Sequence, residues 1–161
     1  MRAAIVTVST SVAAGATEDT SGAALARCAE SAGATVVAQE VVTDDQAAIE
    51  SVLRRHIDDD VALIFTTGGT GFTPDDVTPE ATKAVIDREA PGYAEAMRAE
   101  SVKYTPMGIL TRGVSGIANR TLIVNFPGNP KAIAQLWPVI APTLDHAVAT
   151  LRREGGRPAG H

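Results

Sequence analysis

The sequence predicts an α/β fold, a three-layer α/β/α sandwich built on a mostly parallel central sheet with a mixed edge. Short β-branched runs alternate with amphipathic stretches along the 161-residue chain, and this order favours parallel strands with helices on both sides. The run at 61–66 is short and almost continuously apolar, as expected of a strand covered on both faces. We therefore expect one domain over residues 1–153 and a frayed tail at 154–161.

Strands and helices are expected to alternate through the first half of the chain. Apolar residues recur at helical spacing between the β-branched runs. Asp44 or Asp45 can cap the second helix, because a carboxylate before a helix accepts hydrogen bonds from the free amides of its first turn. The expected strands cover residues 2–8, 35–42 and 61–66, and the expected helices cover 21–32 and 46–57.

The third helix has a clear start signal, with a capping hydroxyl at Thr78, a proline at the first helical position and Glu80 in the first turn. We expect it to run to about residue 88. A further helix is expected at 93–102, after the break made by Pro91 and Gly92.

The remainder is expected to complete the sheet and add a last helix. The stretches 108–114 and 120–125 are expected to pair partly antiparallel across a turn-like segment at 115–119. From Pro130 onward apolar residues recur at helical spacing, and Pro138 and Pro142 should kink or restart that helix.

The composition is that of a soluble globular protein, with 45% apolar and 20% charged residues. Cys28 is the only cysteine, which excludes an internal disulfide and a cysteine metal cluster and fits a reducing cytoplasmic location. No apolar run approaches the roughly 18 residues of a membrane span. The net charge is −5 and the basic residues are scattered, which argues against nucleic acid as a partner.

The glycine-rich loop at 66–71 is the main candidate for a binding site. Three glycines and three threonines in six residues let the backbone turn sharply and point several amides at one anion. The loop lacks the Lys-Ser/Thr pair of a phosphate-binding P-loop. The alternative is a tight strand-exit loop with no ligand.

Two further features are expected at the same end of the sheet. Residues 127–130 follow a strand and open a helix, where free amides attract phosphate, although a simple turn explains them as well. Asp44 and Asp76 could hold Mg²⁺, which usually takes one or two carboxylates plus substrate phosphates. For Asp45 and Asp75 we expect helix capping. The histidines form no pair, so zinc and Cys-His chemistry lack support.

The loops together resemble the molybdopterin adenylyltransferase family, which includes the bacterial Mog and MoaB proteins and a domain of gephyrin. The resemblance covers about residues 2–151. Its most specific parts are Thr-Thr-Gly-Gly-Thr-Gly at 66–71, Asp-Val-Thr-Pro-Glu-Ala at 76–81 and Pro-Gly-Asn-Pro at 127–130. Asp-Thr-Ser-Gly at 19–22 and Thr-Asp-Asp-Gln at 43–46 match further family elements.

The resemblance implies that ATP and molybdopterin react, with Mg²⁺, to give adenylylated molybdopterin and pyrophosphate. It implies Asp44 and Asp76 as catalytic acids and Mg²⁺ ligands. It also implies a homotrimer or hexamer and transfer of the product to a molybdenum insertase. The substrate-binding residues that it implies are Ser21, Gly22, Thr67, Gly68, Gly69, Thr70, Gly71, Ser115, Pro127, Gly128 and Asn129.

One departure from the family pattern follows the first strand, where many members carry Ser-Asp-Arg and this chain has Ser9, Thr10 and Ser11. Two other functions remain open. A non-catalytic molybdopterin-binding or scaffold protein would share the pocket, although it would not need two metal-competent acids. A nucleotide hydrolase resembling the domain of competence-damage proteins would share the fold.

Overall fold

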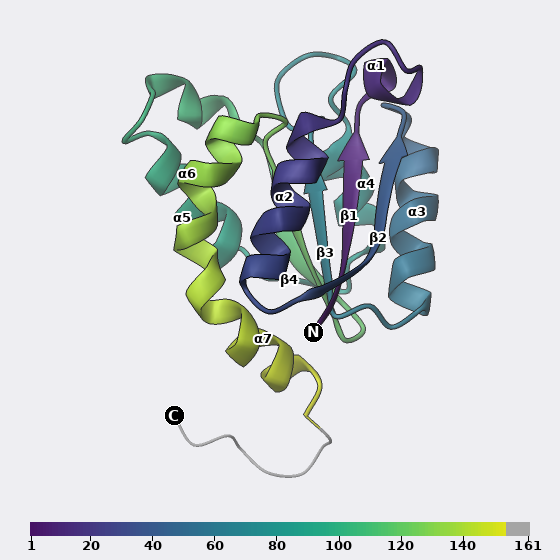
Figure 1. Cartoon of the computed structure of the whole chain (residues 1–161), viewed down its shortest axis with the longest axis vertical. Helices are drawn as coiled ribbons and strands as arrows, with labels where there is room; N and C mark the ends of the chain where they lie inside the picture. The colour runs from purple at the N-terminus through teal and green to yellow at the C-terminus, as the bar shows by residue number, and fades with distance from the viewer. Residues whose placement is uncertain (154–161) are drawn as a thin grey trace.

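The computed structural model describes residues 1–153 and contains a six-stranded sheet in the order β2-β1-β3-β6-β5-β4 (Figure 1). Four strands run parallel, namely β1 (Arg2–Val8), β2 (Thr35–Val42), β3 (Leu63–Thr67) and β6 (Thr121–Phe126). At the edge, β5 (Ser115–Ala118) pairs antiparallel with β6, and the short β4 (Arg88–Glu89) pairs antiparallel with β5. The predicted mostly parallel sheet with a mixed edge is confirmed.

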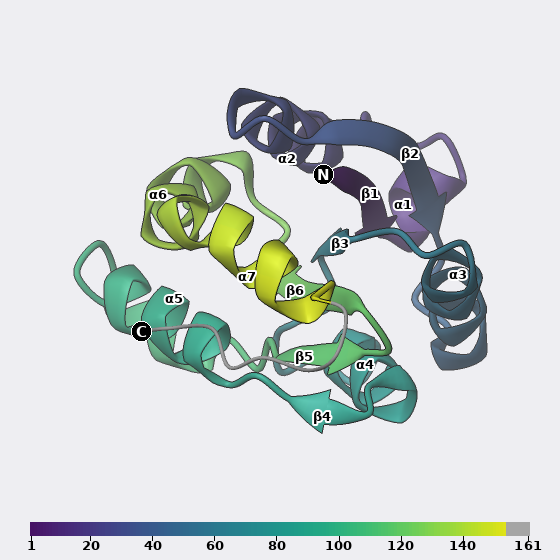
Figure 2. The same cartoon turned by 90° about the horizontal axis from the view of Figure 1, so that it is seen from below.

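Helices cover both faces of the sheet (Figure 2), which confirms the three predicted layers. One face carries α2, α5 and α6, and the other carries α3 and α4. The helices are α1 (Thr10–Ala13), α2 (Thr20–Ser31), α3 (Gln46–Asp58), α4 (Thr78–Val85), α5 (Gly92–Ser101), α6 (Pro130–Ile140) and α7 (Leu144–Leu151). Two 3₁₀ turns lie at Pro106–Leu110 and Ala141–Thr143.

The central strands contribute side chains to two hydrophobic cores, one on each face of the sheet, because successive side chains alternate between the faces. Ala3 and Ile5 of β1 lie in the core under α2, whereas Ala4 and Val6 lie in the core under α3. All four are fully buried. This double burial explains the continuous apolar runs from which the sheet was predicted.

Three aromatic rings form the centre of the core under α6. The ring of Trp137 lies 5.3 Å from that of Phe65 on β3 and 6.0 Å from that of Phe126 on β6. The rings of Phe65 and Phe126 meet edge to face at 5.9 Å. Phe126 is the last residue of β6 and Phe65 is the central residue of β3, so the cluster packs against the strands that lead into the two loops.

The end of α4 differs from its prediction. The helix stops at Val85 rather than near residue 88, because the chain after it joins the sheet as β4. The amide of Asp87 donates to the carbonyl of Ile117 at 2.7 Å, so this backbone finds its partner in β5 instead of in another helical turn.

The strand that pairs with β6 was also predicted in the wrong place. Residues 115–118 form β5, although they were assigned to a turn, and the turn lies at Asn119, with φ of 52°. The packing at Gly116 explains the error, since an added Cβ would lie 2.7 Å from the Ile86 side chain. The glycine that suggested a turn is therefore needed inside the strand for close packing.

The restart predicted at Pro142 and one cap prediction are confirmed in the described residues, whereas α6 continues through Pro138 to Ile140. Pro138 lies inside α6, and Pro142 lies in the 3₁₀ turn after which the chain restarts as α7. Asp45 caps α3 by accepting from the amide of Ala48 at 2.9 Å. Within residues 1–153 none of the helices is both long and apolar enough to cross a membrane. The predicted frayed tail at 154–161 lies outside the described residues.

Candidate active site

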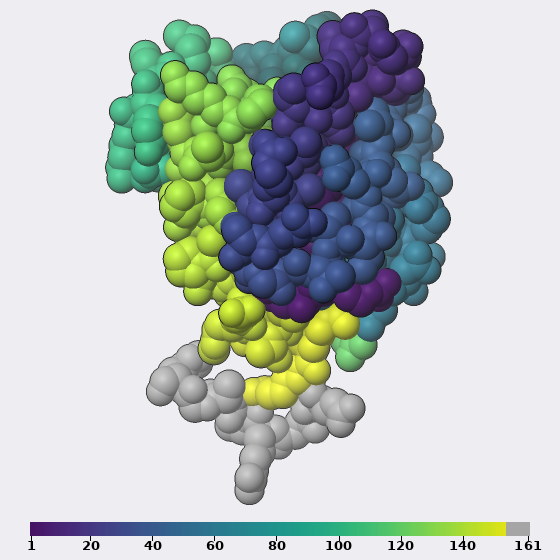
Figure 3. Space-filling model, viewed as in Figure 1, coloured from purple at the N-terminus to yellow at the C-terminus, as the bar shows by residue number. Residues whose placement is uncertain are grey.

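A pocket of about 490 Å³ lies at the carboxyl ends of the parallel strands, where ligands bind in open α/β sheets. It is formed by the end of β1 with α1, the start of α2, the loop after β2 and the loop after β3. In the space-filling view, α1 and the chain leading into α2 form the upper rim of the molecule (Figure 3). The predicted site residues that line the pocket are Ser21, Asp44, Thr67, Gly68, Gly69, Thr70, Gly71, Asp76 and Gly128.

The glycines of the loop after β3 are required by its backbone. Gly68 and Gly69 have φ of 99° and 67°, a region that side chains disfavour. A Cβ on Gly68 would lie 2.3 Å from the carbonyl oxygen of Val8, and a Cβ on Gly69 would lie 2.3 Å from the hydroxyl of Thr78. The loop is therefore pressed against both the end of β1 and the start of α4.

Threonine hydroxyls tie this loop to its neighbours. Thr78 donates to the carbonyl of Gly68 at 2.9 Å, and Thr67 donates to the carbonyl of Pro127 at 2.9 Å. The predicted capping role of Thr78 was wrong, because Val77 is the N-cap residue of α4 and the helix has no side-chain cap. The same observation contradicts capping by Asp75. The buried Thr78 instead holds the glycine loop through the hydrogen bond from its hydroxyl to Gly68.

The carboxylates of Asp44 and Asp76 reach the pocket from different loops, and each is held by a threonine. Asp44 Oδ2 accepts from the amide and the hydroxyl of Thr10 at 3.0 and 2.9 Å. Asp76 Oδ2 accepts from the amide and the hydroxyl of Thr73, also at 3.0 and 2.9 Å. Both carboxylates are therefore fixed at the pocket wall before any ligand binds.

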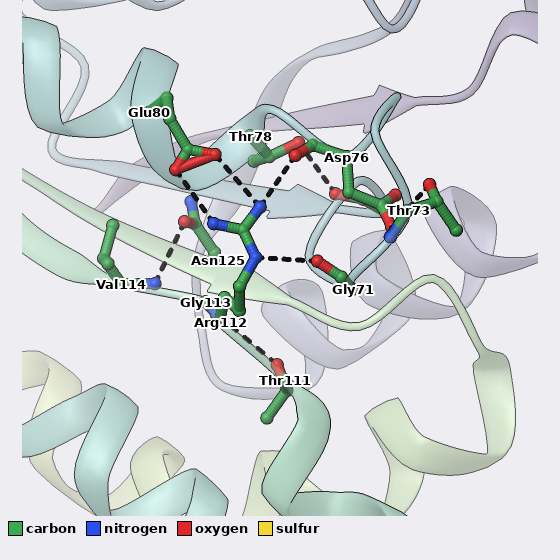
Figure 4. Close-up of polar contacts among 11 residues, drawn as sticks. Gly71, Thr73, Asp76, Thr78, Glu80, Thr111, Arg112, Gly113, Val114 and Asn125 are labelled. Carbon is green, nitrogen blue, oxygen red and sulfur yellow. Dashed lines mark hydrogen bonds and ion pairs between the residues drawn. The ribbon is translucent and has the colours of Figure 1, made fainter.

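Arg112 anchors the same loop from outside (Figure 4). Its Nε donates to the carbonyl of Gly71 at 2.7 Å, and its Nη2 donates to the carbonyl of Asp76 at 2.7 Å. Both terminal nitrogens donate to the carboxylate of Glu80, and the backbone amide donates to the carbonyl of Thr70. A single guanidinium thus joins the glycine loop, the Asp76 segment and α4.

The bidentate pair with Arg112 lowers the pKa of Glu80 below its usual value. A carboxyl group with a lower pKa in the folded than in the unfolded state stabilises the fold at every pH above its unfolded-state pKa. This contribution disappears as the pH falls through the folded-state pKa. We expect Glu80→Gln to lower the free energy of unfolding at pH 7 by less than about 1 kcal/mol, since the pair is partly exposed. Urea unfolding at pH 7 and pH 3 tests this: the difference from wild type should shrink at pH 3.

The control for that measurement is Glu30→Gln, which removes an exposed carboxylate from α2. It should change stability little at either pH. A Glu80→Gln deficit of the same size at both pH values would contradict the ion-pair interpretation.

Four predicted residues do not line the pocket. Gly22 is buried at the start of α2, where its amide donates to the capping carboxylate of Asp19. Asn129 caps α6, and Pro127 lines a neighbouring apolar pocket between α5 and α6. Ser115 lies elsewhere, because its buried hydroxyl donates to the carbonyl of Ala90 and accepts from an amide of α5.

The sequence reasoning missed several residues around the pocket. Glu18 lines it directly, Thr10 and Thr73 hold the carboxylates, and Arg112 holds the loop. Only Thr10 carried a signal, as it stands where many family members have an aspartate. The segment containing Arg112 was expected to be a strand, and its contacts with the glycine loop join residues 41 positions apart, which local sequence does not indicate.

The charged side chains that line the pocket in the described part of the chain are Glu18, Asp44 and Asp76, all of them acidic. An anionic ligand would be repelled unless cations accompany it. Within residues 1–153 no group of three or more His, Cys, Asp or Glu side chains could hold a metal alone. Two carboxylates nevertheless suffice for Mg²⁺ when substrate phosphates supply the other ligands. The donor set therefore fits a metal that arrives with a nucleotide.

A glycine-rich loop beside carboxylates, at the strand ends of an α/β sheet, is typical of proteins that bind phosphorylated ligands. A family model described as a probable molybdopterin binding domain matches residues 4–146. The chain belongs to this family.

Individual relatives agree with this family. The molybdenum cofactor synthesis protein cinnamon of Drosophila melanogaster is 42% identical over 133 residues, which are 81% of this chain and 22% of that protein. The molybdopterin adenylyltransferase of Helicobacter pylori is 43% identical over 110 residues, 68% of this chain and 62% of that protein. The chain therefore spans less than two thirds of either relative.

Solved structures share the fold along nearly the whole chain. The crystal structure of the molybdopterin biosynthesis enzyme MoaB from Thermus thermophilus superposes with a TM-score of 0.88 at 42% identity. The match covers 93% of this chain and 95% of that one. The predicted fold and family are thereby confirmed.

Proposed function

We propose that this protein transfers AMP from ATP to the terminal phosphate of molybdopterin, in a reaction that depends on Mg²⁺. A phosphate oxygen of molybdopterin attacks the α-phosphorus of ATP. The bond between this phosphorus and the oxygen that bridges the α- and β-phosphates breaks, and pyrophosphate leaves. The phosphate nucleophile is already ionised near pH 7, so the reaction needs no strong general base. The name of the Helicobacter pylori relative supports this choice of substrates.

The observation that carries the proposal is the meeting of two fixed carboxylates with the glycine nest in one pocket. The amide of Gly68 donates to the carbonyl of Phe126 at 3.1 Å, so the amides of residues 69–71 would bind phosphate oxygens. Asp44 and Asp76 would hold Mg²⁺ on the nucleotide. The metal would neutralise phosphate charge, which the acidic lining cannot do. The chain itself contributes position and a fixed electrostatic environment, the main sources of rate in phosphoryl-type transfer.

The size and shape of the pocket also suit this role. A volume of about 490 Å³ lies within the range of small-molecule sites. Ser21 at the start of α2 and Gly128 in the loop after β6 stand on its wall with the glycine loop. Gly128 approaches that loop closely, as an added Cβ would lie 3.1 Å from Gly68 Cα. One ligand can therefore contact both loops.

The test is an assay of purified protein with molybdopterin, ATP and Mg²⁺, in which adenylylated product and pyrophosphate are quantified. We expect the two products in equal amounts, and none of either when EDTA removes the metal. Molybdopterin binding without product would overturn the proposal and favour a scaffold protein. Phosphate released from ATP without molybdopterin would favour a hydrolase.

A further inference from the structure

The two carboxylates of the pocket are held by the same arrangement, although they lie on unrelated loops. Thr10 follows β1 and donates to Asp44, which follows β2 and lies 34 positions further along the chain. Thr73 binds Asp76 within the loop after β3. In each case one amide and one hydroxyl of a threonine donate to Oδ2 of the aspartate.

This arrangement leaves one carboxylate oxygen available on each aspartate. Two donors match the two lone pairs of Oδ2. Among residues 1–153 no hydrogen bond reaches Oδ1 of Asp44 or of Asp76. The threonines therefore divide each carboxylate into an oxygen bound to the protein and an oxygen free for a ligand.

The two threonines contact the carboxylates from outside the pocket. Asp44 and Asp76 line the pocket, whereas Thr10 and Thr73 do not. Since neither threonine lines the pocket, we expect its effect on a bound nucleotide to pass through the aspartate. Side chains that orient a metal ligand from outside commonly change metal affinity by tenfold or more.

Thr10 makes a reciprocal connection that depends on its hydroxyl. The hydroxyl donates to the Asp44 carboxylate and also accepts from the Asp44 amide at 3.1 Å. An aspartate at position 10, as in the Ser-Asp-Arg element of many family members, would have no proton to donate at neutral pH. It would also place a like charge beside Asp44. The departure from the family pattern thus gives this chain a donor at that point.

We propose that Thr10 and Thr73 are positioning residues that fix Asp44 and Asp76 with Oδ1 directed to a metal–nucleotide complex. This inference rests on the proposed function for the identity of the ligand. It concerns the affinity of the pocket for a divalent cation in the presence of nucleotide. It can therefore be measured without molybdopterin and without turnover.

The experiment measures Mn²⁺ binding by electron paramagnetic resonance, with α,β-methylene-ATP present so that no AMP is transferred. We expect Thr10→Val and Thr73→Val each to weaken Mn²⁺ binding by about tenfold, because valine keeps the shape and the amide but loses the hydroxyl. Thr10→Ser and Thr73→Ser should stay within about twofold of wild type, since serine restores the donor.

The matched control is Thr35→Val, at the exposed opposite end of β2, which should bind Mn²⁺ as wild type does. Asp44→Asn and Asp76→Asn set the scale for loss of a carboxylate. Should Thr10→Val fail to fold, Thr73→Val still decides, because its bonds stay within one loop. A purely structural role would lower the unfolding temperature and leave Mn²⁺ affinity unchanged.

The outcomes separate this inference from the proposed function. Valine variants that bind Mn²⁺ within twofold of wild type, while the asparagine variants do not, would overturn the positioning role. Wild-type protein that binds no Mn²⁺ with the nucleotide analogue would overturn it as well. If wild type forms no adenylylated molybdopterin but the valine variants lose Mn²⁺ as expected, the proposed reaction fails and the positioning role stands.

Discussion

Replacement of Asp76 by asparagine is expected to lower the turnover of AMP transfer by on the order of a hundredfold or more, with molybdopterin binding largely intact. The carboxylate lines the pocket and its Oδ2 is fixed by Thr73, so its charge is oriented before the substrates arrive. Asparagine keeps the shape but removes the negative charge that a metal–nucleotide complex requires. Single-turnover rates at saturating ATP and Mg²⁺ measure the loss.

Asp75→Asn is the matched control, because it removes the same charge one residue away on an exposed side chain. We expect its rate to lie within about twofold of wild type, since exposed charges act weakly. Equal losses in the two variants would mean that general charge, and not the position of Asp76, supports the reaction. Unchanged turnover in Asp76→Asn would refute the role assigned to it.

Replacement of Arg112 by alanine is expected to reduce both activity and stability. The guanidinium holds the carbonyls of Gly71 and Asp76 and forms a bidentate pair with Glu80. Its loss leaves these groups without their donor and frees the glycine loop. We expect the melting temperature to fall by about 5 °C, equivalent to about 2 kcal/mol. We also expect the KM for ATP to rise by about tenfold, because a freed loop must be ordered again when ATP binds.

Two further variants identify which part of the Arg112 contact matters. Arg112→Lys keeps the charge but not the planar set of donors, so it should behave more like alanine than like wild type. Glu80→Gln weakens only the ion pair and should leave the KM for ATP nearly unchanged. Calorimetry and initial-rate kinetics measure the two effects. A KM for Arg112→Ala equal to that of wild type would contradict the anchoring role of the guanidinium.

The parts of the fold that could be predicted were those in which local sequence and burial agree. β1 and the other central strands are apolar because helices cover both of their faces, and the helices between them have a clear spacing. The edge of the sheet was not predictable in the same way. Gly116 and its neighbours favour a turn by composition, and only the packing of Ile86 against that glycine explains a strand there.

The candidate site also contains residues that local sequence predicts and residues that it does not. Its glycines and Asp44 could be located because strand ends and φ > 0 loops have direct sequence signals. Arg112 and Thr10 could not be assigned their contacts, because these span 41 and 34 residues of sequence and depend on the finished fold. Ser115 was wrongly expected to line the pocket. Its hydroxyl instead forms hydrogen bonds with the backbone of Ala90 and Ala94.

The aromatic cluster gives this protein a natural spectroscopic probe. Trp137 is the only tryptophan in the sequence, so the indole emission reports on one position. This residue is 7% exposed and its ring contacts Phe65 and Phe126, which belong to the two strands whose following loops meet at Gly68 and Gly128. A shift of the emission to longer wavelength marks water reaching this cluster. Unlabelled protein can therefore be followed by fluorescence through unfolding and through ligand binding.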